Sequence, residues 1–277
     1  MAPEFRLGVR VDGPHARYRD PRSRAALMAL LGTAWPRVPK CIDAARDDGW
    51  DWDLMTEPFA VDLDGAPIAH AGVLIHPIRV AGTDCDVAGV HAVCTAPEHR
   101  RQGHARTALD EATRWIDAHG MLAKLHTAVP EVYEPLGFRS VPVHRFRVER
   151  AGGRDVPETR PPQLEDLHAR LARRAPVSDR FASRDPGWLF GIDLRLGGRD
   201  VSALQLVDDL VADELPSLQV LCAEAPRHRA VELSFCPDLL APEATPIAAP
   251  EEGVLMIRGD WPLSADVPLG YSPLSEH

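Results

Sequence analysis

The chain has 277 residues, and at roughly 100–200 residues per domain this length favours two domains over one. Hydrophobic residues make up 45% and charged residues 26%, a composition that excludes a wholly disordered protein. The formal net charge of −10 argues against nucleic acid as a partner, because nucleic-acid-binding proteins normally carry a basic face. An acidic surface instead suits a cationic small molecule or a basic peptide.

No apolar run reaches the ~18 residues that span a bilayer, and the first residues lack the basic-then-apolar profile of a signal peptide. We therefore expect no membrane partner and a cytoplasmic protein. Lysine is rare beside arginine, a bias that suggests a bacterial genome rich in GC. The five cysteines are scattered without a CxxC pair, so we expect reduced thiols rather than a disulfide framework or a cysteine zinc site.

In chain order, the first half predicts a strand at 5–11, two helices, three antiparallel strands, a long helix and further strands. Asp20-Pro21 predicts the start of the first helix, and residues 36–47 form the second. Strands at 57–63 and 68–80 are joined by Asp64-Gly65, a strong hairpin signal, and residues 86–95 form the third strand. A helix at 103–119, a strand at 122–129, a short helix at 131–136 and a strand at 138–148 follow. This order indicates an α+β domain with one mixed central sheet.

Glycines and prolines crowd residues 150–163, which we read as a linker between a domain at 1–149 and a second at 164–277. Beyond the linker we expect helices at 164–174 and 215–224. We expect strands at 189–196, 203–210, 231–235 and 253–257, and an irregular tail.

The segment 93–105 carries the strongest chemical signal. A strand ends, a polar turn follows, and a helix opens at Gly103 and Ala105. The first amides of such a helix have no internal partners and, with the helix dipole, bind an anion such as a phosphate. Arg100 and Arg101 add positive charge there. The alternative is a plain strand-to-helix connection with a surface arginine pair.

The run Arg100-Arg101-Gln102-Gly103-His104-Ala105 resembles the Q/R-x-x-G-x-G/A signature of the GNAT family, the GCN5-related N-acetyltransferases. Residues 95–99 resemble the usual lead-in, and residues 132–138 resemble the family's Y-x-x-L-G-F segment. The resemblance implies a GNAT-like mixed central sheet flanked by helices. The second half, through residues 208–215 and 231–235, resembles more weakly the degenerate second GNAT domain of tandem acetyltransferases, a smaller α/β domain.

The resemblance also implies acetyl-CoA as co-substrate and direct transfer of the acetyl group to an amine. The backbone of Val93 and Thr95 would bind the pantetheine arm, and Tyr133 would protonate the departing thiolate. The pyrophosphate would lie on the loop formed by Arg100, Arg101, Gln102, Gly103, His104 and Ala105. No metal is required, and the scattered histidines show no metal-type spacing.

The general base is less clearly marked. Strict alternation places His91 on the same face as Val93 and Thr95, with Cys94 opposite, and a neutral imidazole there can accept a proton. The alternative is a strand histidine that bonds a neighbour without titrating. This strand has no glutamate, which puts a direct carboxylate base in doubt, and Asp84 and Asp86 are outside candidates.

Five aspartates and two tryptophans crowd residues 43–53. Trp50, Asp51, Trp52 and Asp53 are therefore our candidates for binding a cationic amine, because carboxylates and aromatic faces both attract cations. The alternative is a solvated acidic loop that the tryptophans anchor.

Together these patterns predict an acetyl-CoA-dependent N-acetyltransferase for a small cationic amine, with a homodimer as an option. A protein N-terminus or lysine as acceptor, or a non-catalytic acyl-CoA sensor, are the alternatives.

Overall fold

A computed structural model describes residues 16–47, 51–149, 173–184, 214–215, 230–249, 253–263 and 267–272. Four helices open the described chain: α1 (Ala16–Arg19), α2 (Pro21–Ala34), α3 (Val38–Asp47) and α4 (Trp52–Met55). Asp20 caps α2 by accepting a hydrogen bond from the amide of Ser23, and Pro21 occupies its first turn, as the sequence predicts. The predicted strand at 5–11 lies outside the described residues.

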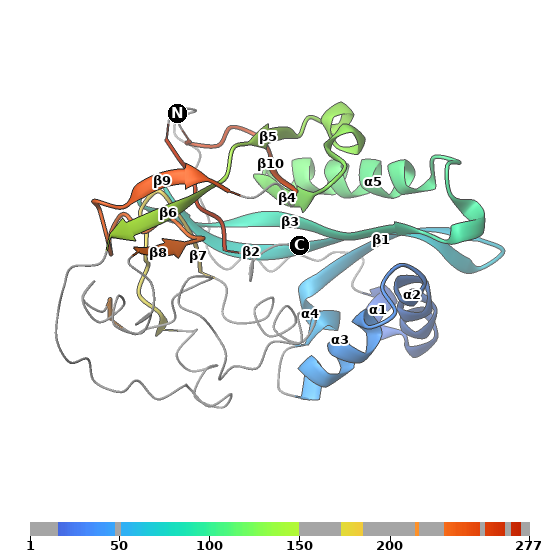
Figure 1. Cartoon of the computed structure of the whole chain (residues 1–277). Helices are drawn as coiled ribbons and strands as arrows, with labels where there is room; N and C mark the ends of the chain where they lie inside the picture. The colour runs from blue at the N-terminus through green and yellow to red at the C-terminus, as the bar shows by residue number, and fades with distance from the viewer. Residues whose placement is uncertain are drawn as a thin grey trace.

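Strands β1 (Thr56–Leu63), β2 (Ala66–Val80) and β3 (Thr83–Thr95) form an antiparallel meander. Asp64 and Gly65 both have positive φ, at 50° and 80°, which confirms the predicted tight hairpin between β1 and β2. A 3₁₀ turn η1 (Pro97–His99), helix α5 (His104–Ala118) and strand β4 (Ala123–Thr127) follow. In Figure 1, α5 lies on one side of the sheet and α1–α4 lie on the other.

Beyond β4 come the 3₁₀ turns η2 (Pro130–Val132) and η3 (Glu134–Leu136), then β5 (Arg139–Val141) and β6 (His144–Glu149). The predicted single strand at 138–148 is therefore two strands, and they enter different sheets. The second half contributes β7 (Phe181–Ser183), β8 (Ala230–Leu233), β9 (Thr245–Ala248) and β10 (Val254–Arg258). Strands β8 and β9 flank β6 in a separate three-stranded sheet at the far end of the molecule (Figure 1).

The central sheet has the order β1-β2-β3-β4-β10-β5, with β7 paired to β2. Only β3 and β4 among these described strands pair in parallel, so the sheet is mixed. The prediction of an α+β fold with a mixed central sheet flanked by helices is confirmed.

Strand β10 comes from the second half but lies between β4 and β5. Met256 of β10 is fully buried and packs in the core between the sheet and α5. Arg258 forms a bidentate ion pair with Asp117 at the end of α5 and donates to the carbonyl of Leu136 at 2.8 Å. The described parts of the two halves therefore share one hydrogen-bonded sheet. The domain boundaries at 149 and 164 stay a prediction, since the residues between them are not described.

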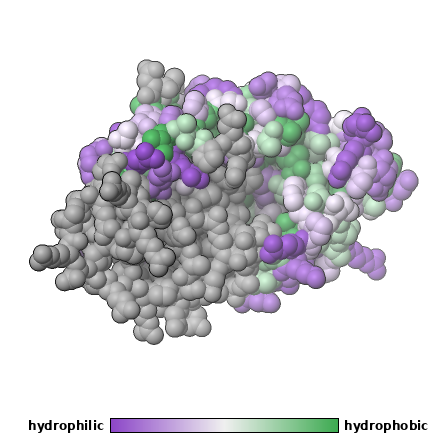
Figure 2. Space-filling model, viewed as in Figure 1, coloured by the Kyte–Doolittle hydropathy of each residue, from purple (hydrophilic) through white to green (hydrophobic). Residues whose placement is uncertain are grey.

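The predicted strands at 231–235 and 253–257 correspond to β8 and β10. The predicted strands at 189–196 and 203–210, and nearly all of the helices at 164–174 and 215–224, lie outside the described residues. No helix in the described part of the chain is long and apolar enough to cross a membrane. Figure 2 shows hydrophilic side chains over much of the described surface, with hydrophobic ones scattered between them.

We expect Met256→Ala to lower the free energy of unfolding by about 2–5 kcal/mol, because it removes a fully buried side chain from the core between the sheet and α5. Urea denaturation measures the loss. Leu63→Ala is the control, because Leu63 is 47% exposed and surface truncations change stability by about 0.5 kcal/mol or less. Equal small losses for both variants would show that β10 does not complete the sheet.

Candidate active site

The two parallel strands of the sheet touch only briefly. Strand β3 pairs with β4 at Ala88–Ala123 and Gly89–Lys124, and no further pair joins them although both strands continue. Past Gly89, one edge of β3 therefore pairs with no strand among the described residues, and we call this unpaired edge the β3–β4 opening. The backbone groups of Val93 and Thr95 lie in this part of β3. Unpaired strand amides and carbonyls beside an opening are suited to bind an amide-bearing chain.

A bulge interrupts β3 at this opening. Ala92 has φ of +50°, and the register with β2 shifts between His70 and Gly72. The extra residue changes which face each side chain occupies. Val93 packs on the α5 side of the sheet, whereas Ala92 and Cys94 pack on the α1–α4 side. The prediction that His91 shares a face with Val93, opposite Cys94, is wrong, because it assumed unbroken alternation.

His91 lies buried on the α1–α4 side of the sheet. Its ring packs edge-on against Trp52 with centroids 4.7 Å apart, and its Nε2 lies 3.3 Å from the hydroxyl of Thr56. A β-carbon at Gly72 would lie 2.7 Å from His91 Nε2, so glycine at this position leaves the room that the ring occupies. Burial, followed by the charges of His70 and Lys124, lowers the pKa of His91 to about 3. The imidazole is therefore neutral at pH 7.

The predicted anion loop opens α5. Gly103 is the N-cap residue in the left-handed conformation, with φ of 86°, and no side chain caps the helix. A β-carbon at Gly103 would meet no protein atom within 4 Å, so the loop faces open space. The side chain of Arg100 folds back and donates to the carbonyl of Thr95 at 3.2 Å. The first amides of the 15-residue helix α5 are thus uncapped at the end of β3, which suits an anion.

Tyr133 lies between η2 and η3, on the β4 side of the opening. It is 8% exposed and packs with Phe138 in the core on the α5 side. Burial raises the pKa of its phenol, and a hydrogen bond with the side chain of Thr127 at the end of β4 opposes that shift. Tyr133 is therefore protonated at neutral pH and can act as a proton donor. Sequence reasoning missed Thr127, whose contact with Tyr133 no local motif signals.

The acidic segment has partners within the fold. Asp51 caps α4, and Asp53 pairs with Arg24 at 2.5 Å and with Arg46 at 3.8 Å. Burial raises the pKa of Asp53 while Arg24 opposes that shift. Trp52 is buried against His91 rather than exposed to a ligand. Trp50 lies outside the described residues. The structure thus brings Trp52 and His91 together. The carboxylates of Asp51 and Asp53 instead hold α2, α3 and α4.

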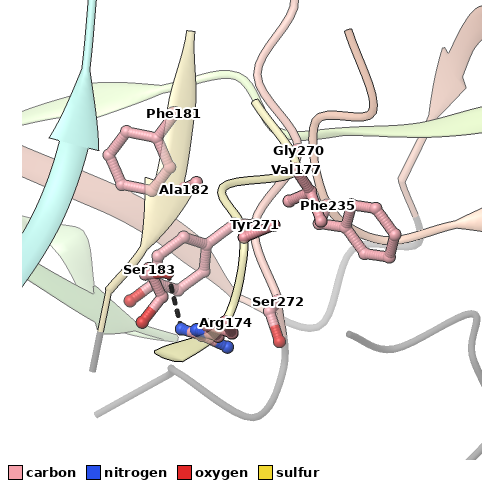
Figure 3. A pocket seen from close by; sticks show the side chains of 10 residues that line it. Arg174, Val177, Phe181, Ala182, Ser183, Phe235, Gly270, Tyr271 and Ser272 are labelled. Atoms are coloured by element: carbon pink, nitrogen blue, oxygen red, sulfur yellow. Dashed lines mark hydrogen bonds between the residues drawn. The ribbon is translucent and has the colours of Figure 1, made fainter. Parts of the chain in front are cut away.

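A buried lysine lies on the same face as His91. Lys124 of β4 is fully buried, donates a hydrogen bond to the hydroxyl of Tyr271, and lies 4.9 Å from the centroid of that ring. Tyr271 also lines a small pocket of the second half (Figure 3). Across this pocket Arg174 donates to the carbonyl of Ser183 at 2.5 Å. Burial lowers the pKa of His76 and that of His126, and the charge of Lys124 lowers both further. Sequence analysis did not single out Lys124.

Within the described ranges, no three histidine, cysteine or acidic side chains are placed to share a metal ion. That the reaction needs no metal stays a prediction.

Comparison with known proteins concerns the family and the fold of the chain. Residues 25–144 match the model of the acetyltransferase (GNAT) family. This match agrees with the resemblance that the sequence shows in its first half. Its matched range covers both sides of the β3–β4 opening, the loop at Gly103, and Tyr133.

Two solved structures share the fold over most of the chain. One is Eis1 from Mycobacterium abscessus, with 16% identity and a TM-score of 0.58 over 86% of this chain and 71% of Eis1. The other is a conserved protein of Enterococcus faecalis V583 described as a probable N-acyltransferase, with 12% identity and a TM-score of 0.59 over 86% and 70% of the two chains. Among curated proteins, no sequence matches this chain.

We expect the free energy of unfolding to fall as the pH drops below about 6.5. Burial lowers the pKa of His70 to about 4 and that of His91 to about 3, so the unfolded chain takes up protons that the folded chain does not. The stability is complete above pH 6.5 and is lost between pH 6.5 and 4, by roughly 3 kcal/mol for His70 alone.

Urea denaturation between pH 7.5 and 4.5 tests this expectation. Replacing His70 with Asn should flatten the slope, because Asn does not titrate. A free energy of unfolding that is constant across this range in the unchanged protein would contradict the burial of two neutral histidines.

Proposed function

We propose that the protein is an acetyl-CoA-dependent N-acetyltransferase that moves the acetyl group directly to the amine of a small acceptor. The observation that carries this proposal is the opening between β3 and β4, next to the uncapped start of α5. The strand edge that pairs with no described strand past Gly89 suits the amides of a pantetheine arm, and an uncapped helix end suits a pyrophosphate. The match to the GNAT family supports the same assignment.

In this proposal, the backbone of Val93 and Thr95 orients the thioester, and the amides from Arg101 to Ala105 bind the pyrophosphate. Arg100 contributes by bonding the carbonyl of Thr95, which fixes the turn between the strand and the helix. Most of the rate enhancement then comes from holding the thioester and the amine in line.

The chemistry needs an acid and an unprotonated amine. The amine attacks the acetyl carbonyl, the carbon–sulfur bond breaks, and Tyr133 gives its proton to the departing thiolate. The raised pKa of Tyr133 keeps that proton available at pH 7. Water then returns a proton to the phenolate as the products leave.

We propose that the acceptor approaches on the α1–α4 side, where His91 and Trp52 lie. With a pKa of about 3, His91 is a weak base at pH 7, because an efficient general base has a pKa near the working pH. The proton of the amine therefore passes to water rather than to His91. Asp51 and Asp53 hold α2–α4 together, so they shape the wall of this site rather than neutralise a cationic acceptor.

The low pKa of His91 is also the observation that favours a second candidate, a non-catalytic module that binds acyl-CoA. This module would use the same loop and opening but would not accelerate transfer. Binding and turnover of matched variants separate the two candidates.

We expect Gly103→Ala to raise the Kd for acetyl-CoA at least about tenfold, because an L-residue resists φ of 86° and shifts the loop that receives the pyrophosphate. Gly120→Ala is the matched control. Gly120 has φ of 61° at the other end of the same helix, and a β-carbon there also meets nothing within 4 Å. Calorimetry measures both constants. Equal weakening by the two variants would show that helix strain, not the loop, governs binding.

We expect Tyr133→Phe to lower kcat by about a hundredfold or more, the usual size of a general-acid contribution, while the Kd for acetyl-CoA stays within about twofold. Release of free thiol across a panel of amines measures turnover. Unchanged turnover would remove Tyr133 from the mechanism. Acetyl-CoA binding by the unchanged protein without turnover on any amine would favour the non-catalytic module.

A further inference from the structure

The bulge in β3 places an alanine in a backbone conformation that alanine disfavours. Ala92 has φ of +50°, a left-handed conformation that costs an alanine energy and that glycine adopts readily. Because Ala92 is not glycine, neighbouring groups must hold this conformation in place. The bulge lies immediately before Val93, so it sets the course of the β3 edge along the opening.

One side chain contacts the bulge directly. His70 of β2 is fully buried, and its Nδ1 lies 2.8 Å from the carbonyl oxygen of Ala92. A carbonyl oxygen only accepts hydrogen bonds, so Nδ1 carries the proton and donates it. Nε2 of the same neutral ring is then an acceptor. Burial lowers the pKa of His70 to about 4, which is consistent with this neutral form at pH 7.

A second buried side chain completes the pair. The hydroxyl of Tyr18 lies 3.1 Å from His70 Nε2 and donates to it, and Tyr18 is only 2% exposed. Tyr18 belongs to α1, which Arg17 ties to β1 through a bidentate ion pair with Asp62. A continuous chain of hydrogen bonds therefore runs from α1 through His70 to the backbone of Ala92.

We propose that Tyr18 and His70 are positioning residues for acetyl-CoA. They hold the Ala92 bulge, and the bulge directs the backbone of Val93 and Thr95 toward the pantetheine arm. This inference rests on the proposed function, because it assigns the β3 edge to acetyl-CoA. Neither side chain contacts the reacting atoms.

The competing explanation is that His70 only fills space in the core. Two substitutions separate the explanations, because one retains the hydrogen-bond donor of the ring and the other retains more of its volume. His70→Asn keeps a donor near the place of Nδ1 but loses volume. His70→Gln keeps more volume and reaches toward Tyr18, but it places no donor at Ala92.

We expect His70→Gln to raise the Kd for acetyl-CoA about tenfold, the loss typical of one hydrogen bond, and His70→Asn to raise it less than about threefold. Tyr18→Phe should fall between them. Calorimetry gives Kd, and thermal denaturation gives Tm for the same samples. Ile42→Val, a purely apolar change in the same core cluster, is the control, which should lower Tm without changing Kd.

If His70 only fills space, His70→Asn should raise the Kd for acetyl-CoA more than His70→Gln does. That result, or equal Kd values for the two variants, would overturn the proposal. If His70→Gln folds poorly, the double variant that also carries Ala92→Gly tests the proposal, because glycine adopts the left-handed conformation of the bulge without support. Restored binding in that double variant supports the proposal, and unrestored binding overturns it.

The proposed function is tested on the unchanged protein, because a failure of that protein to bind acetyl-CoA contradicts the function itself. In that case NMR still tests the role of His70, through the backbone amide resonances of Ala92 and Val93. If they are the same in the unchanged protein and in His70→Gln, His70 does not hold the bulge.

Discussion

The contact between β3 and β4 is the constraint on which the rest of the site depends. Two parallel strands that pair at only two positions leave an open strand edge inside a folded domain, where unpaired backbone groups normally cost stability. The bulge at Ala92 and the loop at Gly103 lie along and just beyond that edge. In the proposed function, the amides and the pyrophosphate of acetyl-CoA bind these two features, which would offset the cost of the unpaired backbone groups.

The opening also explains why the second half is needed. With β3 and β4 apart, β4 would be poorly held, but β10 pairs with all five of its residues from Ala123 to Thr127. Arg258 then ties β10 to the end of α5, and Lys124 reaches Tyr271. The second half therefore stabilises the β4 side of the opening and covers part of the face that His91 occupies.

Local patterns predicted those parts of the fold that short-range physics determines. The Asp20 cap, the Asp64-Gly65 hairpin and the glycine that opens α5 each follow from the preferred backbone conformation of a few adjacent residues. The face of His91 was predicted wrongly, because a bulge at an alanine has no sequence signal and one extra residue reverses the alternation. The place of β10, and the contacts of His70 with Tyr18, join residues far apart in the chain, which no local pattern reports.

Hydrogen–deuterium exchange with and without acetyl-CoA tests the central claim most directly, because it needs no knowledge of the acceptor. The account predicts slower exchange at the amides of Val93 and Thr95 and in the first turn of α5 when acetyl-CoA is present. Protection confined to other parts of the chain, or no change at these amides under saturating acetyl-CoA, would contradict the assignment of the β3–β4 opening as the co-substrate site.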